Sequence, residues 1–138
     1  MSETHRPRRV LRRVGAVLAG LLAIFILSTA TDILMHSTGV FPPLGQAMGS
    51  SLFLIALAYR IVYGVAGCYL AARLAPDRPM LHALALGIVG LAAGIAGAAI
   101  MWDAGPAWYS LAVIAIAIPC AWAGGRLRVM QLRPRRPD

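Results

Sequence analysis

The chain has 138 residues and a formal net charge of +8, with 59% hydrophobic and only 13% charged residues. Soluble domains average about 45–50% apolar and about 25% charged residues, so the composition argues against an ordinary soluble domain. A strongly basic chain can indicate nucleic-acid binding. Here the arginines flank long apolar segments, so we expect the chain to interact with the lipid bilayer and not with nucleic acid.

Residues 1–13 are polar and arginine-rich, and we expect a disordered cytoplasmic tail there. Four apolar runs follow, each close to the roughly 20 residues that a helix needs to cross a bilayer. The runs are Val14 to Met35, Ser51 to Leu74, Met80 to Trp102 and Ala107 to Gly125. The predicted organisation is therefore a basic tail at 1–13, a transmembrane domain at 14–125 and a second basic tail at 126–138.

This pattern predicts an all-α polytopic membrane protein with about four transmembrane helices in an up-down-up-down bundle. Only helices and closed barrels satisfy their backbone polar groups in lipid. The runs lack the alternation of barrel strands. Arginines precede the first run, lie between the second and third, and follow the fourth. The positive-inside rule then places both termini in the cytoplasm.

A secretory signal peptide is an alternative interpretation of residues 1–30. An arginine-rich start and an apolar run lead to Ser28, Thr29 and Ala30, which resemble a cleavage site with small residues. Cleavage would leave three helices. The apolar run is long for a signal and the later charge pattern fits four spans, so we favour an uncleaved first helix.

Small residues predict where the helices touch. Membrane helices associate through close backbone approach at glycine and alanine. Steps of three and four residues place the glycines of the third run on one face, and those of the second run on another. We interpret them as packing positions, with a pore or moving gate as the alternative. The predicted positions are Gly64, Gly67, Gly87, Gly90, Gly94 and Gly97.

One charge lies deep in the second run. Arg60 is about 13 residues from the cytoplasmic end, roughly 20 Å deep at 1.5 Å per residue. A charge near the bilayer centre costs about 2.5–3.5 kcal/mol on insertion scales and needs a partner. Asp32 in the first run lies roughly 8 Å higher, within reach of an arginine side chain. We therefore predict an intramembrane polar cluster of Asp32, His36 and Arg60, built around an Asp32–Arg60 ion pair.

Two interpretations of the cluster remain open. The ion pair can fix the first helix against the second, or the acid and the histidine can form a proton or ion path. A permanently charged Arg60 would hold Asp32 ionised, which makes a poor proton carrier and favours the structural interpretation.

No sequence pattern indicates an enzyme, a metal site or a cofactor. The chain has no nucleophile triad, no H-E-x-x-H motif and no phosphate-binding loop. His36 and His82 are predicted at opposite membrane boundaries, so they cannot ligate one haem. Cys68 and Cys120 lie inside apolar runs and are best interpreted as small apolar residues.

Several strings resemble small bacterial inner-membrane proteins of unknown function. The strings include Ala58-Tyr59-Arg60, Pro79-Met80-Leu81-His82-Ala83 and Gly105-Pro106-Ala107-Trp108-Tyr109. The resemblance implies a four-helix bacterial inner-membrane protein and implies no activity. Small multidrug exporters share this size and helix number, but they carry an acidic residue in the middle of their first helix, and this chain has none there.

The sequence thus favours a non-enzymatic accessory or structural membrane protein, partnered by the bilayer and by a second copy or another membrane protein. The alternative is a small oligomeric transporter or ion-conducting protein that uses Asp32, His36 and Arg60. Four short helices enclose little volume, so a transporter of this size would have to oligomerise.

Overall fold

The computed structural model describes residues 5–134, so the outermost parts of both predicted tails, 1–4 and 135–138, lie outside the described residues. The described part folds into α1 (His5–Ser37), α2 (Ser50–Leu74), α3 (Pro79–Ile100) and α4 (Ala107–Leu132), with a short 3-10 turn η1 (Trp102–Ala104) before α4. Each of the four α-helices is long and apolar enough to cross a membrane. The prediction of an all-helical protein with four such helices is confirmed.

The helices extend beyond the predicted transmembrane domain at both ends. α1 begins at His5, so residues 5–13 are helical where we expected a disordered tail. Arginine is a good helix former, and Pro7 lies within the first turn, where proline is tolerated. At the other end α4 continues past Gly125 to Leu132, and Arg133 adopts an extended conformation before Pro134.

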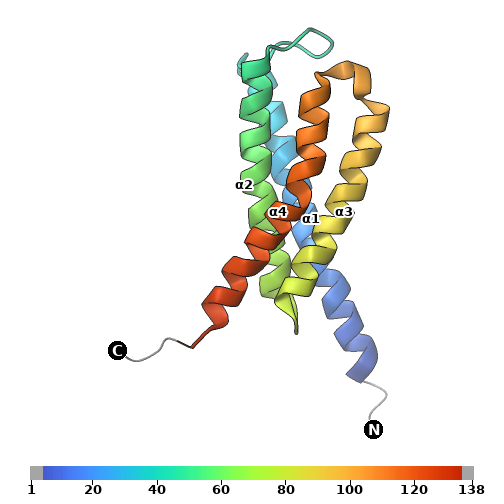
Figure 1. The fold of residues 1–138 in the computed structure, drawn as a ribbon, viewed down its shortest axis with the longest axis vertical. Coiled ribbons are helices and arrows are strands. Elements are labelled where there is room, and N and C mark those ends of the chain that lie inside the picture. The colour runs from blue at the N-terminus through green and yellow to red at the C-terminus, as the bar shows by residue number, and fades with distance from the viewer. Residues whose placement is uncertain (1–4, 135–138) are drawn as a thin grey trace.

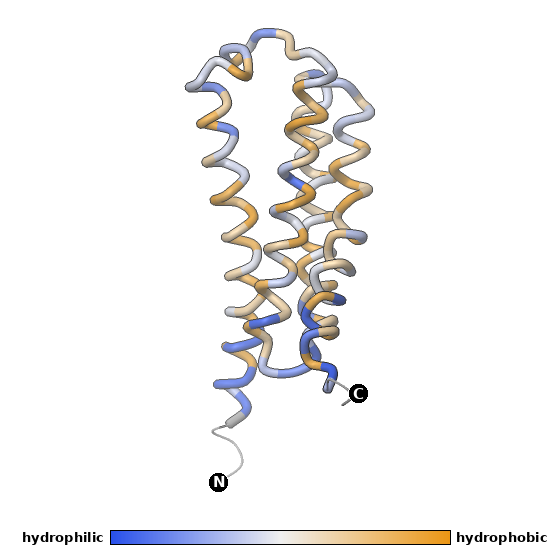
Figure 2. Tube along the Cα trace, turned by 90° about the vertical axis from the view of Figure 1, so that its left-hand side faces the viewer, coloured by the Kyte–Doolittle hydropathy of each residue, from blue (hydrophilic) through white to orange (hydrophobic). Residues whose placement is uncertain are grey.

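The first and last described residues lie at one end of the bundle. Figure 1 shows both described ends of the chain and the α2–α3 turn at the lower end, and the α1–α2 loop and the α3–α4 turn at the upper end. Hydrophilic residues concentrate at the lower end and in the upper loops, with mostly apolar residues along the helices between them (Figure 2). The closest helix pairs are α1 with α2, α2 with α4 and α3 with α4, whereas α1 touches α3 much less.

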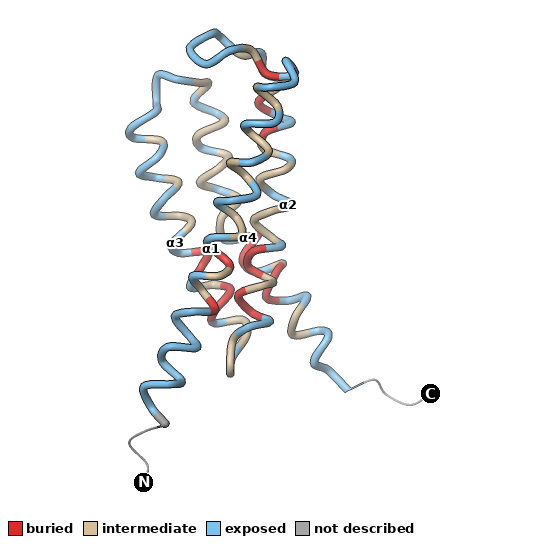
Figure 3. Tube along the Cα trace, turned by 180° about the vertical axis from the view of Figure 1, so that it is seen from behind, coloured by how far each residue is buried: buried red, intermediate tan, exposed pale blue. Residues whose placement is uncertain are grey.

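The core lies mainly toward the lower end. Most buried residues gather where the helices cross there, and a smaller buried group lies near the upper loop (Figure 3). The lower core is made of small side chains with one leucine, which lets the backbones come close. Its members are Cys68, Ala71, Ala72, Ala83, Leu86 and Ala121.

The glycines do not share one contact surface. A Cβ atom on Gly67 would lie 2.9 Å from the Gly20 carbonyl oxygen in α1, whereas one on Gly64 would lie 3.4 Å from the Cys120 Cβ in α4. In α3, a Cβ on Gly87 would lie within 3.4 Å of the Ala117 carbonyl oxygen of α4.

Above Gly87, the glycines of α3 predicted as packing positions have looser surroundings. A Cβ on Gly90 would lie 4.0 Å from the Ala117 Cβ, and one on Gly94 would lie 3.5 Å from Ile114. A Cβ on Gly97 would have nothing within 4 Å, so Gly97 makes no close helix contact within the described single chain. Of these four glycines, Gly87 therefore lies closest to α4, whereas Gly90 and Gly94 would make only ordinary contacts with it.

Candidate functional site

The most concentrated polar network lies between α1 and α2. The Arg60 guanidinium donates a hydrogen bond from Nη2 to Asp32 Oδ2 at 2.8 Å, so the two side chains form an ion pair. Their side chains remain 28% and 33% exposed in the single chain, so the pair lies at the edge of the bundle and is only partly enclosed. A charge pair at this depth in lipid has to be satisfied by protein groups or by water.

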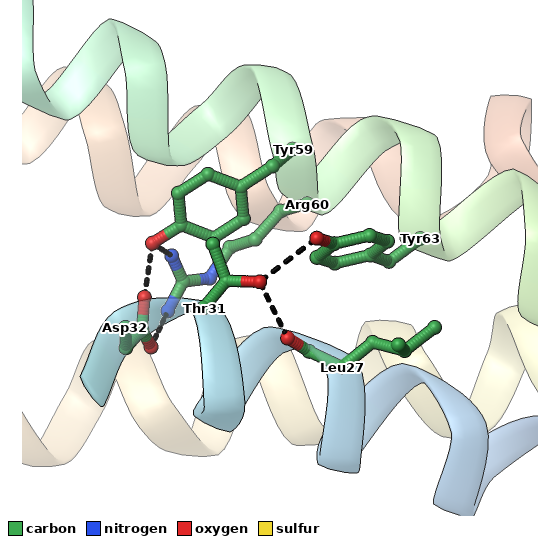
Figure 4. A network of polar contacts seen from close by, with 6 residues as sticks. All are labelled: Leu27, Thr31, Asp32, Tyr59, Arg60 and Tyr63. Carbon is green, nitrogen blue, oxygen red and sulfur yellow. Dashed lines mark hydrogen bonds and ion pairs between the residues drawn. The ribbon is translucent and has the colours of Figure 1, made fainter. Parts of the chain in front are cut away.

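Tyr59 completes the hydrogen bonding of the pair. Its hydroxyl donates to Asp32 Oδ1 and accepts from Arg60 Nη1 at 3.3 Å (Figure 4). The Arg60 guanidinium also lies 5.4 Å from the centre of the Tyr59 ring, within cation–π range. Both carboxylate oxygens of Asp32 therefore accept hydrogen bonds from side chains of α2.

A second bridge joins the same two helices one turn away. The Thr31 hydroxyl lies 2.8 Å from the Tyr63 hydroxyl and 2.8 Å from the Leu27 carbonyl oxygen (Figure 4). A carbonyl oxygen only accepts, so Thr31 donates to Leu27 and the Tyr63 hydroxyl donates to Thr31. The bridge thus repeats the α1–α2 connection without charge.

Helical spacing explains how these side chains come together. Tyr59 and Tyr63 are four residues apart and share one face of α2, with Arg60 beside them. Thr31 and Asp32 are consecutive in α1. The two tyrosines and the threonine were not predicted as site residues, because aromatic and hydroxyl residues in an apolar run usually have a packing role. The Tyr-Arg-x-x-Tyr string of residues 59–63 was the available signal.

His36 has other contacts than the ion pair. Its Nδ1 lies 2.8 Å from the Pro42 carbonyl oxygen, and its ring packs edge-on against Phe41 at 5.5 Å. Since a carbonyl oxygen only accepts, the Nδ1–H of His36 donates this bond. The histidine therefore fastens the α1–α2 loop, and among the described residues it takes no part in the hydrogen bonds of Asp32 and Arg60.

The described residues form no cluster of metal-ligating side chains. No group of three or more His, Cys, Asp or Glu side chains within the described part of the chain lies close enough to hold a metal ion. Cys68 and Cys120 are buried and free. The Cys120 thiol donates to the Ile61 carbonyl oxygen at 3.7 Å, which joins α4 to α2. In the α1–α2 network, an ion pair and side-chain hydrogen bonds join the two helices.

A second ion pair lies at the lower end. Arg13 of α1 donates from Nε to Asp77 Oδ1 at 3.1 Å and from Nη2 to Oδ2, which ties α1 to the α2–α3 turn. The hydrogen bonds from Arg13 hold the pKa of Asp77 below its usual value. Both side chains are substantially exposed to solvent, so solvent screens this contact.

By length and composition all four α-helices qualify as membrane spans, which is the architecture of a multi-pass membrane protein. No protein-family model, curated protein or solved structure matches the chain, so a function has to be inferred from the geometry of the site.

Proposed function

We propose that the chain is a small inner-membrane protein without enzymatic activity, which acts as an accessory or structural partner of another membrane protein. In this proposal its four helices cross the bilayer in up-down-up-down order with both termini in the cytoplasm. The arginine-rich ends of the chain and the arginines of the α2–α3 turn support that orientation, because positive residues favour the cytoplasmic side.

The observation that carries the proposal is the completed hydrogen bonding of the Asp32–Arg60 pair. Asp32 accepts hydrogen bonds from both a guanidinium and a tyrosine hydroxyl of α2, and a carboxylate with both oxygens bound in this way is held in one position between the helices. Within the described residues, no buried side-chain nitrogen or oxygen lacks a hydrogen-bond partner. The network therefore fits a clasp that holds α1 on α2.

The exposure of the ion pair supports a second candidate, a small oligomeric transporter or ion-conducting protein. Roughly a third of the Asp32 side chain is uncovered in the single chain. A second copy placed over α1 and α2 would enclose this charge pair in an oligomer. This candidate needs Asp32 to change its protonation or its partner during transport.

A double-mutant cycle tests the clasp. Removing one member of a buried ion pair typically costs about 3–5 kcal/mol, and removing both restores part of that loss. Because this pair is partly exposed, we expect about 1–3 kcal/mol for Asp32→Asn and for Arg60→Gln. The double variant should be more stable than the sum of the single losses implies. The measurement is the free energy of unfolding in mild detergent.

Additive losses, or a neutral Asp32→Asn, would contradict the clasp. A neutral Asp32→Asn that also abolishes proton or solute flux in proteoliposomes would establish the transporter instead. Tyr69→Phe serves as the matched control, because the Tyr69 hydroxyl donates to Gln131 at an exposed site far from the ion pair.

A further inference from the structure

A pocket opens between α1 and α3 at the lower end of the molecule. Its volume is about 370 Å³, within the range of roughly 300–1,000 Å³ that small-ligand sites occupy. It exists because α1 and α3 approach each other much less closely than the neighbouring helix pairs do. Its lining includes Arg13, Leu18, Asp77, Arg78, His82 and Ala85.

The polar and apolar residues of this pocket are separated along the helix axes. Arg13, Asp77 and Arg78 lie at its lower rim, at the level of the α2–α3 turn. From there α1 rises about 7.5 Å to Leu18, and α3 rises from its first turn to Ala85, and apart from His82 both walls are lined by apolar side chains. A ligand that fits therefore carries a charged group at one end and a hydrocarbon chain at the other.

The charge balance of the pocket favours an anion. Asp77 forms its ion pair with Arg13, so the Arg78 guanidinium in the pocket lining lies outside that pair. The lining has a formal charge of +1 with His82 neutral, from two arginines and one aspartate. The exposed arginines 6, 8, 9 and 12 of α1 add a positive field at the same end.

The backbone of Arg78 is held in a conformation that arginine rarely adopts. Its φ of 43° lies in the left-handed region, which favours glycine. Arg78 directly precedes α3, which begins at Pro79, and the buried His82 ring donates from Nδ1 to the Arg78 carbonyl oxygen at 3.1 Å. Such local strain persists where the surrounding structure enforces it, and here it fixes a cationic residue at the rim of the pocket.

From these observations we infer that the α1–α3 pocket binds one anionic phospholipid. Its phosphate lies against Arg78 at the rim, and one acyl chain runs along Val17, Leu18 and Ala85. Basic pockets between membrane helices on the cytoplasmic side recognise anionic headgroups by this chemistry. The inference concerns a different surface from the Asp32–Arg60 clasp, and it holds whether the protein acts as an accessory partner or as a transporter.

Electron paramagnetic resonance of spin-labelled lipids tests the site. The full chain is reconstituted in phosphatidylcholine vesicles, and the association of spin-labelled phosphatidylglycerol is compared with that of spin-labelled phosphatidylcholine. We expect a preference of about fivefold for phosphatidylglycerol, which corresponds to the effect of one basic residue near the membrane surface. Arg78→Gln should remove most of this preference.

Three further variants separate the pocket from general surface charge. Arg73→Gln removes an exposed arginine at the same end of α2, outside the pocket lining, and should leave the preference intact. Arg78→Gly relieves the left-handed backbone while removing the charge, so it should lose the preference without losing the fold. Ala85→Trp fills the apolar wall and should reduce the immobilised fraction of both lipids.

The inference is overturned if the wild-type protein shows no preference for phosphatidylglycerol. It is equally overturned if Arg73→Gln lowers the preference as much as Arg78→Gln does, since general surface charge then suffices. A stronger preference for spin-labelled phosphatidylethanolamine than for phosphatidylglycerol would also overturn it, because Asp77 would then be binding an ammonium group.

Discussion

The Tyr59 hydroxyl lies between the two charges of the α1–α2 network, donating to Asp32 and accepting from Arg60. Its removal leaves one carboxylate oxygen without this donor while the ring and the ion pair remain. Hydrogen bonds to charged groups contribute about 1.5–3 kcal/mol in soluble proteins and somewhat less between membrane helices. Removing this hydroxyl is thus the smallest change that tests the network alone.

We expect Tyr59→Phe to lower the free energy of unfolding by about 1–2 kcal/mol in mild detergent. Tyr63→Phe should lower it by about 0.5–1.5 kcal/mol, because the Tyr63 hydroxyl meets the neutral Thr31. Equal losses for the two variants would show that the charges of Asp32 and Arg60 contribute nothing beyond an ordinary hydrogen bond.

The residues of the site were only partly predictable. An arginine deep in an apolar run requires an acidic partner, and counting residues along each run leaves Asp32 within reach of Arg60. The rotation of each helix about its own axis decides the rest, and it depends on contacts distributed over the whole bundle. That rotation brings Tyr59 to the pair and leaves His36 with the Pro42 carbonyl.

At the scale of the helices, glycines at the two ends of the bundle have different surroundings. A Cβ atom on Gly124 would lie 2.6 Å from both the Tyr69 backbone nitrogen and the Val65 carbonyl oxygen of α2. Backbone atoms cannot move aside without shifting the helix. A Cβ on Gly97 of α3 would meet nothing within 4 Å.

Alanine substitution therefore has opposite expected effects at these positions. Gly124→Ala should destabilise the bundle by about 1–3 kcal/mol through overpacking. Gly97→Ala should be neutral or stabilising by up to about 1 kcal/mol, since alanine is the better helix former. Thermal unfolding in mild detergent measures both, and a destabilising Gly97→Ala would indicate a contact that the single chain does not contain.

The Arg13–Asp77 contact ties α1 to the α2–α3 turn, and its strength depends on pH. The pKa of Asp77 is lowered by Arg13, so the folded state binds the Asp77 proton more weakly than the unfolded state does. The contribution is then fully present above the unfolded value of about 3.9, and it is lost as the pH falls through the lower, folded value.

We expect the wild-type protein to melt at a higher temperature than Asp77→Asn near neutral pH. The difference should shrink as the pH falls below about 3.9 and disappear once Asp77 is protonated in the folded state as well, and it should also shrink in high salt. A difference in melting temperature that persists unchanged in acid would assign the effect of Asp77 to packing and not to its charge.

The helices themselves were predictable from hydropathy, while their ends were not. Apolar runs of about 20 residues with no alternation leave the helix as the remaining choice in lipid. The extension of α1 back to His5 was missed because arginine and proline were interpreted as marks of disorder. Arginine propagates a helix that is already nucleated, so polarity alone does not end one.

At the scale of the whole molecule, the proposed orientation has a direct test by cysteine labelling. Leu44 lies in the α1–α2 loop and is 87% exposed, whereas Arg133 follows α4 at the opposite end. A membrane-impermeant maleimide should label Leu44→Cys in bacterial spheroplasts, and Arg133→Cys only after lysis. The buried Cys68 and Cys120 give little background. The reverse pattern would invert the orientation.

The concentration of the core at the arginine-rich end has a mechanical consequence. The lower halves of the helices are fastened by close backbone contacts, while the upper halves have fewer buried residues to hold them (Figure 3). Helices answer a change in bilayer thickness by tilting, at a small cost for each ångström of mismatch. Because the lower ends stay packed together, a change of tilt would move the upper ends of the helices apart or together. The angle of that spread would then follow the thickness of the surrounding membrane.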